Sequence, residues 1–331
     1  MNDKKLISVV LPVYNCKEYI NDSVQSILKQ TYKNFELIIV DDGSDDGTLD
    51  ILNNFKDKRI RLYKNKYNRG LIYSLNRALN KSKGQFIARM DADDICELNR
   101  FQKQINYLNK NIEISVVGSA ITLIDNNNRV NQKYLYPHND NLIKWSMFFS
   151  CSVCHPSAMI RSDVFKKINR YSLKAKFAED YDLWSRLIKK KYKFSNLQDS
   201  LIKLRKHKRN ISIENFNAHF LMGARIAHKI IQYNFKFAKK KDFKIIKCIF
   251  SLGKYQKGQS DVSIIYIFKI LKHFVIQNIN NLSLRDLKMI KKSALIKILK
   301  IWIRNINRVN LLRLFQVIFN IIYLELKTTS K

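Results

Sequence analysis

Apolar segments of two different periods alternate along the first 125 residues of the chain. Short, nearly continuous apolar runs predict buried strands, and longer segments with one apolar face predict amphipathic helices. The predicted strands are residues 6–13, 36–40, 59–63 and 85–88, and the predicted helices are residues 17–30, 48–55 and 71–80. This alternation predicts an α/β fold with a mostly parallel sheet flanked by helices.

The pattern changes after about residue 213. Apolar and basic residues alternate at helical spacing in residues 264–275 and again in residues 290–314. This spacing is typical of basic amphipathic helices that lie in a membrane interface. It also fits helices that pack on another domain and keep their lysines in solvent. No uncharged apolar run reaches 18 residues, so we expect no segment to span a bilayer. We therefore divide the chain into residues 1–213 and a helical, basic region of residues 214–331.

Net charge separates the same two regions. The 331 residues carry a formal net charge of +34, and residues 215–331 hold 23 Lys and Arg against 4 Asp and Glu. The preceding 214 residues hold 38 against 23. Such a charge predicts an anionic partner. Because the sequence has no zinc-finger spacing, no aromatic RNA-binding strand and no basic zipper pattern, we expect an anionic membrane surface and no nucleic acid.

The five cysteines, at positions 16, 96, 151, 154 and 248, form no even disulfide framework. A single Cys-x-x-Cys pair is weak evidence for zinc or redox chemistry, so we interpret Cys151 and Cys154 as small apolar residues near a strand. No secretory signal precedes the first predicted strand. We expect a cytoplasmic protein that lies peripherally on the inner face of the cell membrane.

Three carboxylates follow the predicted strand at residues 85–88. Asp91, Asp93 and Asp94 lie within four residues, and like charges this close repel unless a cation or a proton offsets them. Hard carboxylate oxygens suit Mg²⁺ or Mn²⁺, which can then hold a diphosphate. The alternative is an acidic turn that caps the helix beginning near Glu97.

A second acidic pair follows the predicted strand at residues 36–40. Asp41 and Asp42 stand where carboxylates of dinucleotide-binding folds accept hydrogen bonds from ribose hydroxyls. Because neighbouring parallel strands end on one rim of a sheet, we expect Tyr14, Asp41, Asp42 and residues 91–94 to meet there. The sequence has neither GxGxxG nor GxxxxGK[ST], which argues against NAD binding and against a P-loop ATPase.

Four motifs occur in order along the chain: residues 8–15 (SVVLPVYN), 41–44 (DDGS), 68–70 (NRG) and 88–94 (ARMDADD). Together they resemble glycosyltransferase family 2, and residues 155–161 and 178–184 extend the likeness. The resemblance covers about residues 5–212. It implies that residues 1–213 are a catalytic domain of the Rossmann-like GT-A fold. It also implies inverting transfer of a sugar from a nucleotide-diphosphate sugar. Because members of the family commonly use UDP-linked donors, we expect the donor to be UDP-linked.

The resemblance implies roles for individual residues. Asp93 would be the most direct ligand of a divalent cation, with Asp91 and His207 beside it, and Asp180, with Glu179 second, would deprotonate the acceptor hydroxyl. The residues implied to bind the donor nucleotide are Pro12, Tyr14, Asp41, Asp42, Arg69 and Asp91. His155 and Asp182 would line the acceptor pocket.

Several of these residues have plainer explanations. Arg69 lies in a turn that Gly70 alone would explain, and Asp180 and Asp182 favour the dipole of a helix predicted at residues 181–189. His207 stands among lysines, as surface histidines do.

The sequence has no Gln-x-x-Arg-Trp motif, which marks processive members of the family. We therefore expect a hexosyl- or N-acetylhexosaminyltransferase that adds one sugar to a lipid-linked or cell-surface glycan, such as a lipopolysaccharide or capsule precursor. The alternative is a non-catalytic protein of the same fold that binds nucleotide sugars or polyanions. The carboxylates at positions 42, 91, 93 and 180 argue against that alternative.

Overall fold

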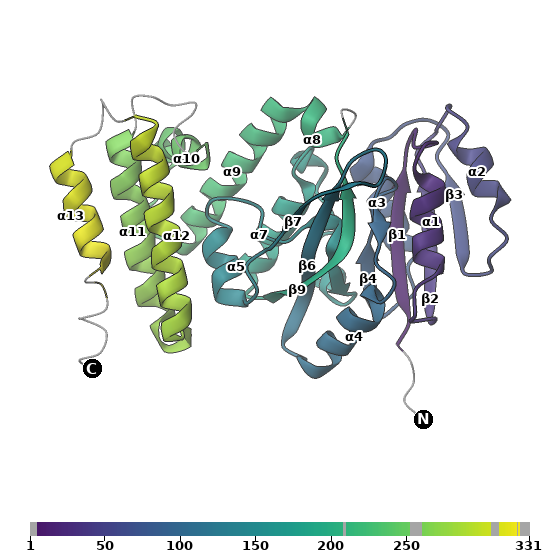
Figure 1. The fold of residues 1–331 in the computed structure, drawn as a ribbon, viewed down its shortest axis with the longest axis horizontal. Helices are drawn as coiled ribbons and strands as arrows, with labels where there is room; N and C mark the ends of the chain where they lie inside the picture. The colour runs from purple at the N-terminus through teal and green to yellow at the C-terminus, as the bar shows by residue number, and fades with distance from the viewer. Residues whose placement is uncertain (1–4, 208–209, 252–259, 306–310, 323, 325–331) are drawn as a thin grey trace. The chain divides into compact units, whose positions relative to one another are not determined.

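The computed structural model describes residues 5–207, 210–251, 260–305, 311–322 and 324. Contacts along the chain form two compact units (Figure 1). Unit 1 comprises Met1–Asn139 and Ser152–His219, and unit 2 comprises Asp140–Cys151 and Phe220–Lys331. The predicted division into a catalytic domain of residues 1–213 and a helical, basic region of residues 214–331 stays a prediction.

The described residues of unit 1 form a nine-stranded sheet of order β3-β2-β1-β4-β8-β6-β9-β5, with β7 paired to β6. The strands are β1 (Ile7–Val13), β2 (Phe35–Asp41), β3 (Ile60–Lys64), β4 (Phe86–Arg89), β5 (Ile95–Cys96), β6 (Ile114–Ile124), β7 (Val130–Tyr134), β8 (Met159–Arg161) and β9 (Lys193–Arg205). Strands β1 to β4 are mutually parallel, and β6 is parallel to β9. The antiparallel pairs all involve strands that follow residue 94.

Helices cover this sheet, which confirms the predicted α/β class (Figure 1). The helices of unit 1 are α1 (Ile20–Leu28), α2 (Thr48–Asn54), α3 (Leu71–Lys81), α4 (Arg100–Lys110), α6 (Val164–Lys167), α7 (Glu179–Lys189) and α8 (Ile211–Glu214), with short 3-10 turns at His155–Ser157 and Leu173–Ala175. Helix α1 buries Ile20, Val24 and Ile27 against the strands, as its apolar spacing predicts. Each predicted strand and helix before residue 90 is present, within three residues at its ends.

Gly43 brings two loops of the sheet's rim together. It has a φ of 79°, and a Cβ there would come within 2.8 Å of the backbone of Tyr67. Only glycine allows both the left-handed backbone and this close approach. The turn after β2 therefore lies against the loop that leads from β3 to α3.

The described residues of unit 2 are helical. They form α5 (Asp140–Ser146), α9 (Phe216–Asn234, which begins in unit 1), α10 (Phe243–Phe250), α11 (Ser260–Asn278), α12 (Leu284–Ile303) and α13 (Leu311–Ile322), with 3-10 turns at Lys240–Asp242 and Ile279–Asn281. Helix α5 comes from the middle of the chain and packs with the late helices through aromatic rings. The ring centroid of Trp145 is 5.6 Å from that of Phe274, and Phe148 is 5.2 Å from Phe235.

Residues 264–275, predicted as an interfacial helix, lie within α11 and pack inside unit 2. Helix α11 contacts α12 and α13 and buries Ile267, Ile270 and Phe274, whereas Lys269 and Lys272 face solvent. The segment therefore packs against the other helices of unit 2. Its contact with a membrane and its packing on the catalytic domain both stay predictions. The second segment, residues 290–314, covers part of α12 and the start of α13, and its residues 306–310 lie outside the described residues.

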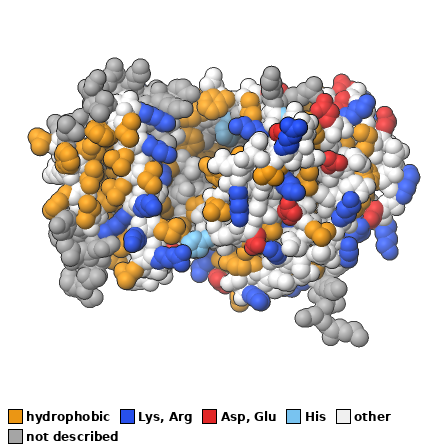
Figure 2. Space-filling view, viewed as in Figure 1, with side chains coloured by type: hydrophobic (Ala, Val, Ile, Leu, Met, Phe, Trp, Pro, Cys, Tyr) orange, Lys and Arg blue, Asp and Glu red, His pale blue; other side chains and the backbone are white. Residues whose placement is uncertain are grey.

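Among the residues described, one helical segment, Ser260–Asn281, is long and apolar enough to cross a membrane. Its mean hydropathy is 1.4, and 44% of its most apolar window is buried inside the structure. Because a core helix of a soluble protein meets the same criterion, the expectation that no segment spans a bilayer stays a prediction. On the face shown in Figure 2, hydrophobic side chains gather over the region of α11, α12 and α13.

Candidate active site

The predicted acidic residues meet at one rim of the sheet. Parallel pairing places Val13, at the end of β1, beside Asp41, at the end of β2. Strand β4 is parallel to β1 and ends at Arg89, so residues 91–94 leave the sheet at the same edge. The convergence predicted from strand order is present in the structure.

Asp42 holds the loop that precedes α3. Its Oδ1 accepts hydrogen bonds from Nδ2 of Asn65 at 2.5 Å and from the backbone N–H of Arg69 at 3.0 Å, and its Oδ2 accepts from the N–H of Gly70 at 2.7 Å. The side chain is buried. Both carboxylate oxygens are therefore used to fix the turn at residues 68–70.

Asp41 is also buried, but its carboxylate accepts fewer hydrogen bonds than that of Asp42. Its Oδ2 accepts the backbone N–H of Ser44 at 3.3 Å, whereas no described residue donates a hydrogen bond to its Oδ1. A buried acceptor without a donor carries an energetic penalty of about 1–3 kcal/mol. This oxygen can accept a hydrogen bond from a ligand at the rim.

The other residues predicted to bind the donor differ in exposure. Pro12 is buried inside β1, whereas Tyr14, just beyond the strand, is 46% exposed. Arg69 is exposed, with its guanidinium 3.7 Å from the ring centroid of Tyr73 and a 2.7 Å hydrogen bond to that residue's hydroxyl. The structure thus holds the Arg69 side chain against α3.

Asp91, Asp93 and Asp94 form a cluster with the geometry of a cation site. One carboxylate oxygen from each lies within 4.8 Å of the others. Oδ1 of Asp94 accepts the backbone N–H of Arg205 at 2.8 Å, and its buried Oδ2 has no hydrogen-bond partner in the part of the chain that the structure describes. Burial raises the pKa of Asp94 well above its ordinary value, and the charges of Asp93 and Asp91 raise it further. A bound cation would relieve this repulsion.

The end of β9 contacts the acidic cluster. Oδ2 of Asp93 accepts hydrogen bonds from Nε2 of His207 at 2.9 Å and from Nδ2 of Asn210 at 3.2 Å. Arg205, almost fully buried, donates to the backbone carbonyls of Asp93 and Asp125 at 2.9 Å. His207 is therefore placed beside Asp93, where the resemblance positioned it.

Arg89 is a site residue that sequence reasoning missed. It is 3% exposed and ion-paired with Asp91. Burial alone would lower the pKa of Arg89, but the charge of Asp91 outweighs burial and raises it. Partial burial raises the pKa of Asp91, although Arg89 opposes this shift. The sequence signal that was available is a charged residue at the last position of a short, otherwise apolar strand.

The start of α7 presents two more carboxylates to the same region. Burial raises the pKa of Glu179 to about 7, and the negative charges of Asp180 and Asp91 contribute to the shift. The charge of Asp180 in turn raises the pKa of Asp91. Glu179 and Asp180 are therefore close enough to the acidic cluster to interact with it electrostatically.

The side chain of His155 lies next to that of Glu179. Its Nδ1 is 3.9 Å from Oε1 of Glu179, and its Nε2 is 2.7 Å from the hydroxyl of Tyr171. Burial lowers the pKa of His155 well below its ordinary value, and the charge of Arg89 lowers it further. The imidazole is therefore neutral and held in place by Tyr171.

Asp182 has a structural contact of its own. Its Oδ2 accepts a 2.8 Å hydrogen bond from Nε of Arg186, one helical turn later. Arg186 also donates to the carbonyls of Asn169 and Arg170. Arg186 thus anchors α7 to the preceding loop, and Asp182 holds the Arg186 guanidinium. The place of Asp182 in an acceptor pocket stays a prediction.

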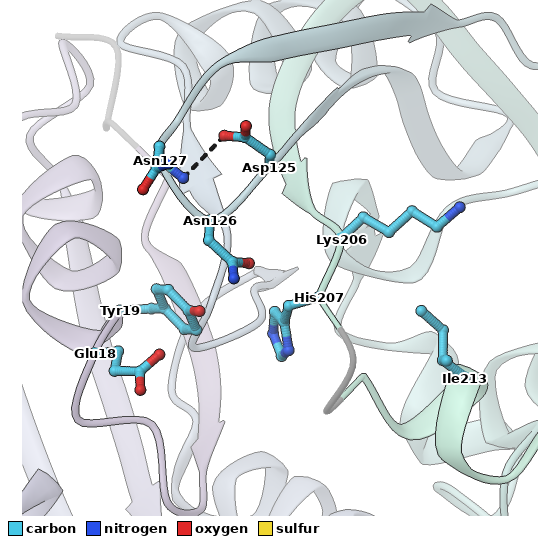
Figure 3. A pocket seen from close by; sticks show the side chains of 8 residues that line it. All are labelled: Glu18, Tyr19, Asp125, Asn126, Asn127, Lys206, His207 and Ile213. Carbon is cyan, nitrogen blue, oxygen red and sulfur yellow. Dashed lines mark hydrogen bonds between the residues drawn. The ribbon is translucent and has the colours of Figure 1, made fainter.

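A cavity of about 800 Å³ is lined in part by His207, which contacts Asp93 of the acidic cluster (Figure 3). Its lining residues are Glu18, Tyr19, Asp125, Asn126, Asn127, Lys206, His207 and Ile213. Tyr19 stacks on His207 with ring centroids 5.2 Å apart, and in Figure 3 the side chain of Lys206 points away from this pair. Sequence reasoning found only His207 in this set. No local pattern identified the others, because they come from four separate segments.

Comparison with known proteins gives a consistent result. Residues 8–169 match the family described as "Glycosyl transferase family 2". The chain is 31% identical over 326 residues to an uncharacterized glycosyltransferase of Haemophilus influenzae, with 93% of this chain and 99% of the relative covered. It is 35% identical over 188 residues to the Escherichia coli UDP-Glc:alpha-D-GlcNAc-diphosphoundecaprenol beta-1,3-glucosyltransferase WfgD, with 56% of this chain and 71% of the relative covered.

The fold has been solved in other proteins. S. aureus TarS 1–349, crystallised in complex with UDP, superimposes with a TM-score of 0.56 at 18% identity. The match covers 95% of this chain and 90% of that chain. At this identity the likeness is one of fold, and it confirms the expected GT-A architecture.

Proposed function

Because the chain belongs to glycosyltransferase family 2, we propose that it transfers a single sugar, with inversion, from a nucleotide-diphosphate sugar to a lipid-linked or cell-surface glycan. One observation carries the proposal. The carboxylates of Asp91, Asp93 and Asp94 gather within 4.8 Å at the sheet's rim, and Glu179 and Asp180 interact with them electrostatically from α7. This arrangement offers a diphosphate site and an acceptor base side by side.

The proposed donor is UDP-linked. UDP-Glc is named for the relative WfgD, and UDP is bound in the structure of TarS, which supports this choice. We assign the base or ribose contact to Oδ1 of Asp41, which has no donor among the described residues, together with Pro12 of β1 and Tyr14 just beyond it. We propose that Asp42 acts by holding the turn that carries Arg69, and that Arg69 contacts the nucleotide.

The acidic cluster fits a divalent cation, Mn²⁺ or Mg²⁺. Its donors are hard carboxylate oxygens, and Oδ2 of Asp94 is buried without a partner among the described residues. Asp93 and Asp91 would be the main ligands, and His207 is the third candidate. When bound, the cation would stabilise the negative charge that grows on the leaving diphosphate. His207 and Asn210 orient the Asp93 carboxylate through their hydrogen bonds.

We assign the acceptor's deprotonation to Asp180, with Glu179 as the second candidate. A base works best when its pKa lies near the working pH, and the raised pKa of Glu179, about 7, meets that condition. Neutral His155, fixed by Tyr171, supports the position of Glu179. We propose that His155 and Asp182 line the acceptor pocket, where both side chains are also held by partners within the chain.

The proposed acceptor is held at a membrane. The acceptor named for WfgD is linked to diphosphoundecaprenol, and this chain carries a net charge of +34. An anionic membrane surface attracts such a charge. We therefore place the protein in the cytoplasm, peripherally on the inner face of the cell membrane.

Calorimetric titration tests the donor site. UDP, dTDP and GDP are titrated, with Mn²⁺ and with a chelator, into wild type, Asp93→Asn and the control Asp199→Asn. Asp199 is a matched carboxylate, 50% exposed and ion-paired with Lys103 away from the rim. We expect one nucleotide to bind only with metal, and to bind at least about tenfold more weakly to Asp93→Asn, at a cost of about 1.4 kcal/mol or more.

Two results would contradict the proposal. If folded wild type binds none of the three nucleotides in a metal-dependent manner, the donor site is wrong. If it binds a nucleotide sugar but never releases the nucleotide in the presence of lipid-linked acceptors, the non-catalytic binding protein becomes the better interpretation.

A further inference from the structure

Helix α13 exposes a row of large apolar side chains. Leu312 is 81% exposed, Phe315 63%, Phe319 57% and Ile322 56%. Their spacing of three and four residues places all four on one side of the helix. An exposed apolar row of this size is unusual on the surface of a soluble monomer.

This row is not the core-facing side of α13. The helix buries Leu314, Val317 and Ile321, which lie on its other side, and it packs against α11 and α12. Helix α13 therefore uses a different apolar face to pack within unit 2. The exposed face needs a separate explanation.

Helix α12 continues the pattern and adds charge. Met289, Ile296 and Ile303 recur every seven residues and are 41%, 42% and 64% exposed. Lys292 and Lys300 are also exposed, and at 100° per residue they lie on either side of this apolar line. The buried residues of α12, such as Ile290 and Ile298, lie on a different side.

We propose that this α12–α13 face, defined by the exposed apolar residues of both helices with Lys292 and Lys300, inserts into the surface of an anionic lipid membrane. An apolar row flanked by lysines matches the two layers of a membrane interface, acyl chains beneath and anionic headgroups above. The excess of 23 basic over 4 acidic residues in residues 215–331 attracts such a surface as a whole. A second copy of this chain would present the same positive charge and be repelled.

The attachment is interfacial and does not use α11. Within the part of the chain that the structure describes, the segment long and apolar enough to cross a membrane contains α11, and α11 packs against α12 and α13 inside unit 2. The inference rests on the proposed function for one point, since a lipid-linked acceptor places the enzyme's substrate at this surface. The contact itself follows from the exposed residues and the charge.

Flotation with lipid vesicles tests the proposal on the full chain. Wild type, Phe315→Gln/Phe319→Gln, Lys292→Glu/Lys300→Glu and the control Ile112→Gln/Leu173→Gln are mixed with neutral vesicles and with vesicles rich in phosphatidylglycerol. The control removes two apolar residues of unit 1 that are 81% and 70% exposed. We expect wild type and the control to float only with anionic vesicles, less so as salt is raised. Both α12–α13 variants should bind at least tenfold more weakly.

Metal-dependent nucleotide binding of the same proteins separates this proposal from the transferase assignment, because neither pair lies at the donor site. We expect it to be unchanged in every variant. Vesicle binding without nucleotide binding in wild type would remove the transferase proposal and leave the membrane face. Wild type that ignores anionic vesicles, or variants that bind them as wild type does, would overturn the membrane face. A wild-type dimer that Phe315→Gln/Phe319→Gln dissociates, with unchanged vesicle binding, would identify a subunit interface instead.

Discussion

Unit 1 buries charged side chains around its candidate site, whereas unit 2 exposes a row of apolar side chains along one helix. In unit 1, Arg100 is fully buried and donates to the carbonyls of Arg89 at 2.9 Å and Ala158 at 3.3 Å, which joins β4 to the strand beside it. Arg205 joins β9 to the acidic cluster in the same manner. In unit 2, Phe315 and Phe319 are more than half exposed.

This contrast reflects two kinds of function. A buried charge is tolerated only when donors and acceptors surround it, so it fixes loops in one arrangement. The rim of unit 1 needs such precision, because several carboxylates must keep their positions around a ligand. An exposed apolar face needs no fixed partner geometry, which suits contact with a fluid surface such as lipid.

Deleting residues 220–331 would test how separable the two units are, and we expect the largest effect from it. Trp145 and Phe148 of the α5 segment would lose the aromatic partners Phe235 and Phe274. Phe149 would lose Lys297, whose Nζ lies 4.8 Å from its ring centroid. Each of the three aromatic side chains of the α5 segment is at most 5% exposed, and exposing one costs about 1.5–3 kcal/mol. The truncated protein should aggregate, measured by light scattering and by dye binding to apolar surface.

Replacing all three aromatics by Gln in the truncated chain is the matched control. It should restore part of the solubility, because the uncovered apolar surface is then removed. A truncated chain that is monomeric and melts within a few degrees of the full protein would show that α5 needs no cover from the late helices.

Asp180→Asn tests the chemistry assigned to unit 1. Loss of a general base reduces kcat about 10²- to 10⁴-fold, while metal-dependent nucleotide binding should persist because Asp180 lies on α7 and not on the strands of the donor site. Steady-state transfer assays and calorimetry measure the two quantities. Glu179→Gln is the comparison variant. A greater loss of kcat in Glu179→Gln than in Asp180→Asn would reverse their assigned order.

The smallest expected effect is a pH dependence of stability that originates at Glu179. Burial raises its folded-state pKa from an ordinary value near 4.5 to about 7, so the folded protein binds the proton more tightly than the unfolded chain does. Its contribution to stability is complete below about pH 4.5 and is lost as the pH rises through 7. In metal-free protein, the free energy of unfolding should therefore fall by about 3 kcal/mol over this range.

Denaturant unfolding at several pH values measures this effect. Glu179→Gln should reduce the pH dependence but not remove it, because burial also raises the pKa values of Asp91 and Asp94. Glu113→Gln, at an exposed glutamate of unit 1, should leave it unchanged. If the free energy of unfolding changes equally with pH in wild type and in Glu179→Gln, another group is responsible for the pH dependence.

Much of unit 1 could be predicted from the sequence because its signals are local. The apolar run at residues 36–40 is sufficient to identify β2, and parallel strand order is sufficient to bring Asp41 and Asp91 to one rim. The family motifs directed attention to Asp93 and His207, which are in contact. Arg89 was missed because its ion pair with Asp91 depends on burial that one strand position does not reveal.

The sequence by itself determined the alternation of strands and helices, the acidic rim and the basic excess of residues 215–331. Only the tertiary structure decided which carboxylates are satisfied: Asp42 is used by its own loop, whereas Asp41 and Asp94 each keep one oxygen without a partner among the described residues. The physical reason is separation along the chain. Periodicity is set by neighbours a few residues apart, but the bond between Asp94 and Arg205 joins positions 111 residues apart and depends on how the whole sheet assembles.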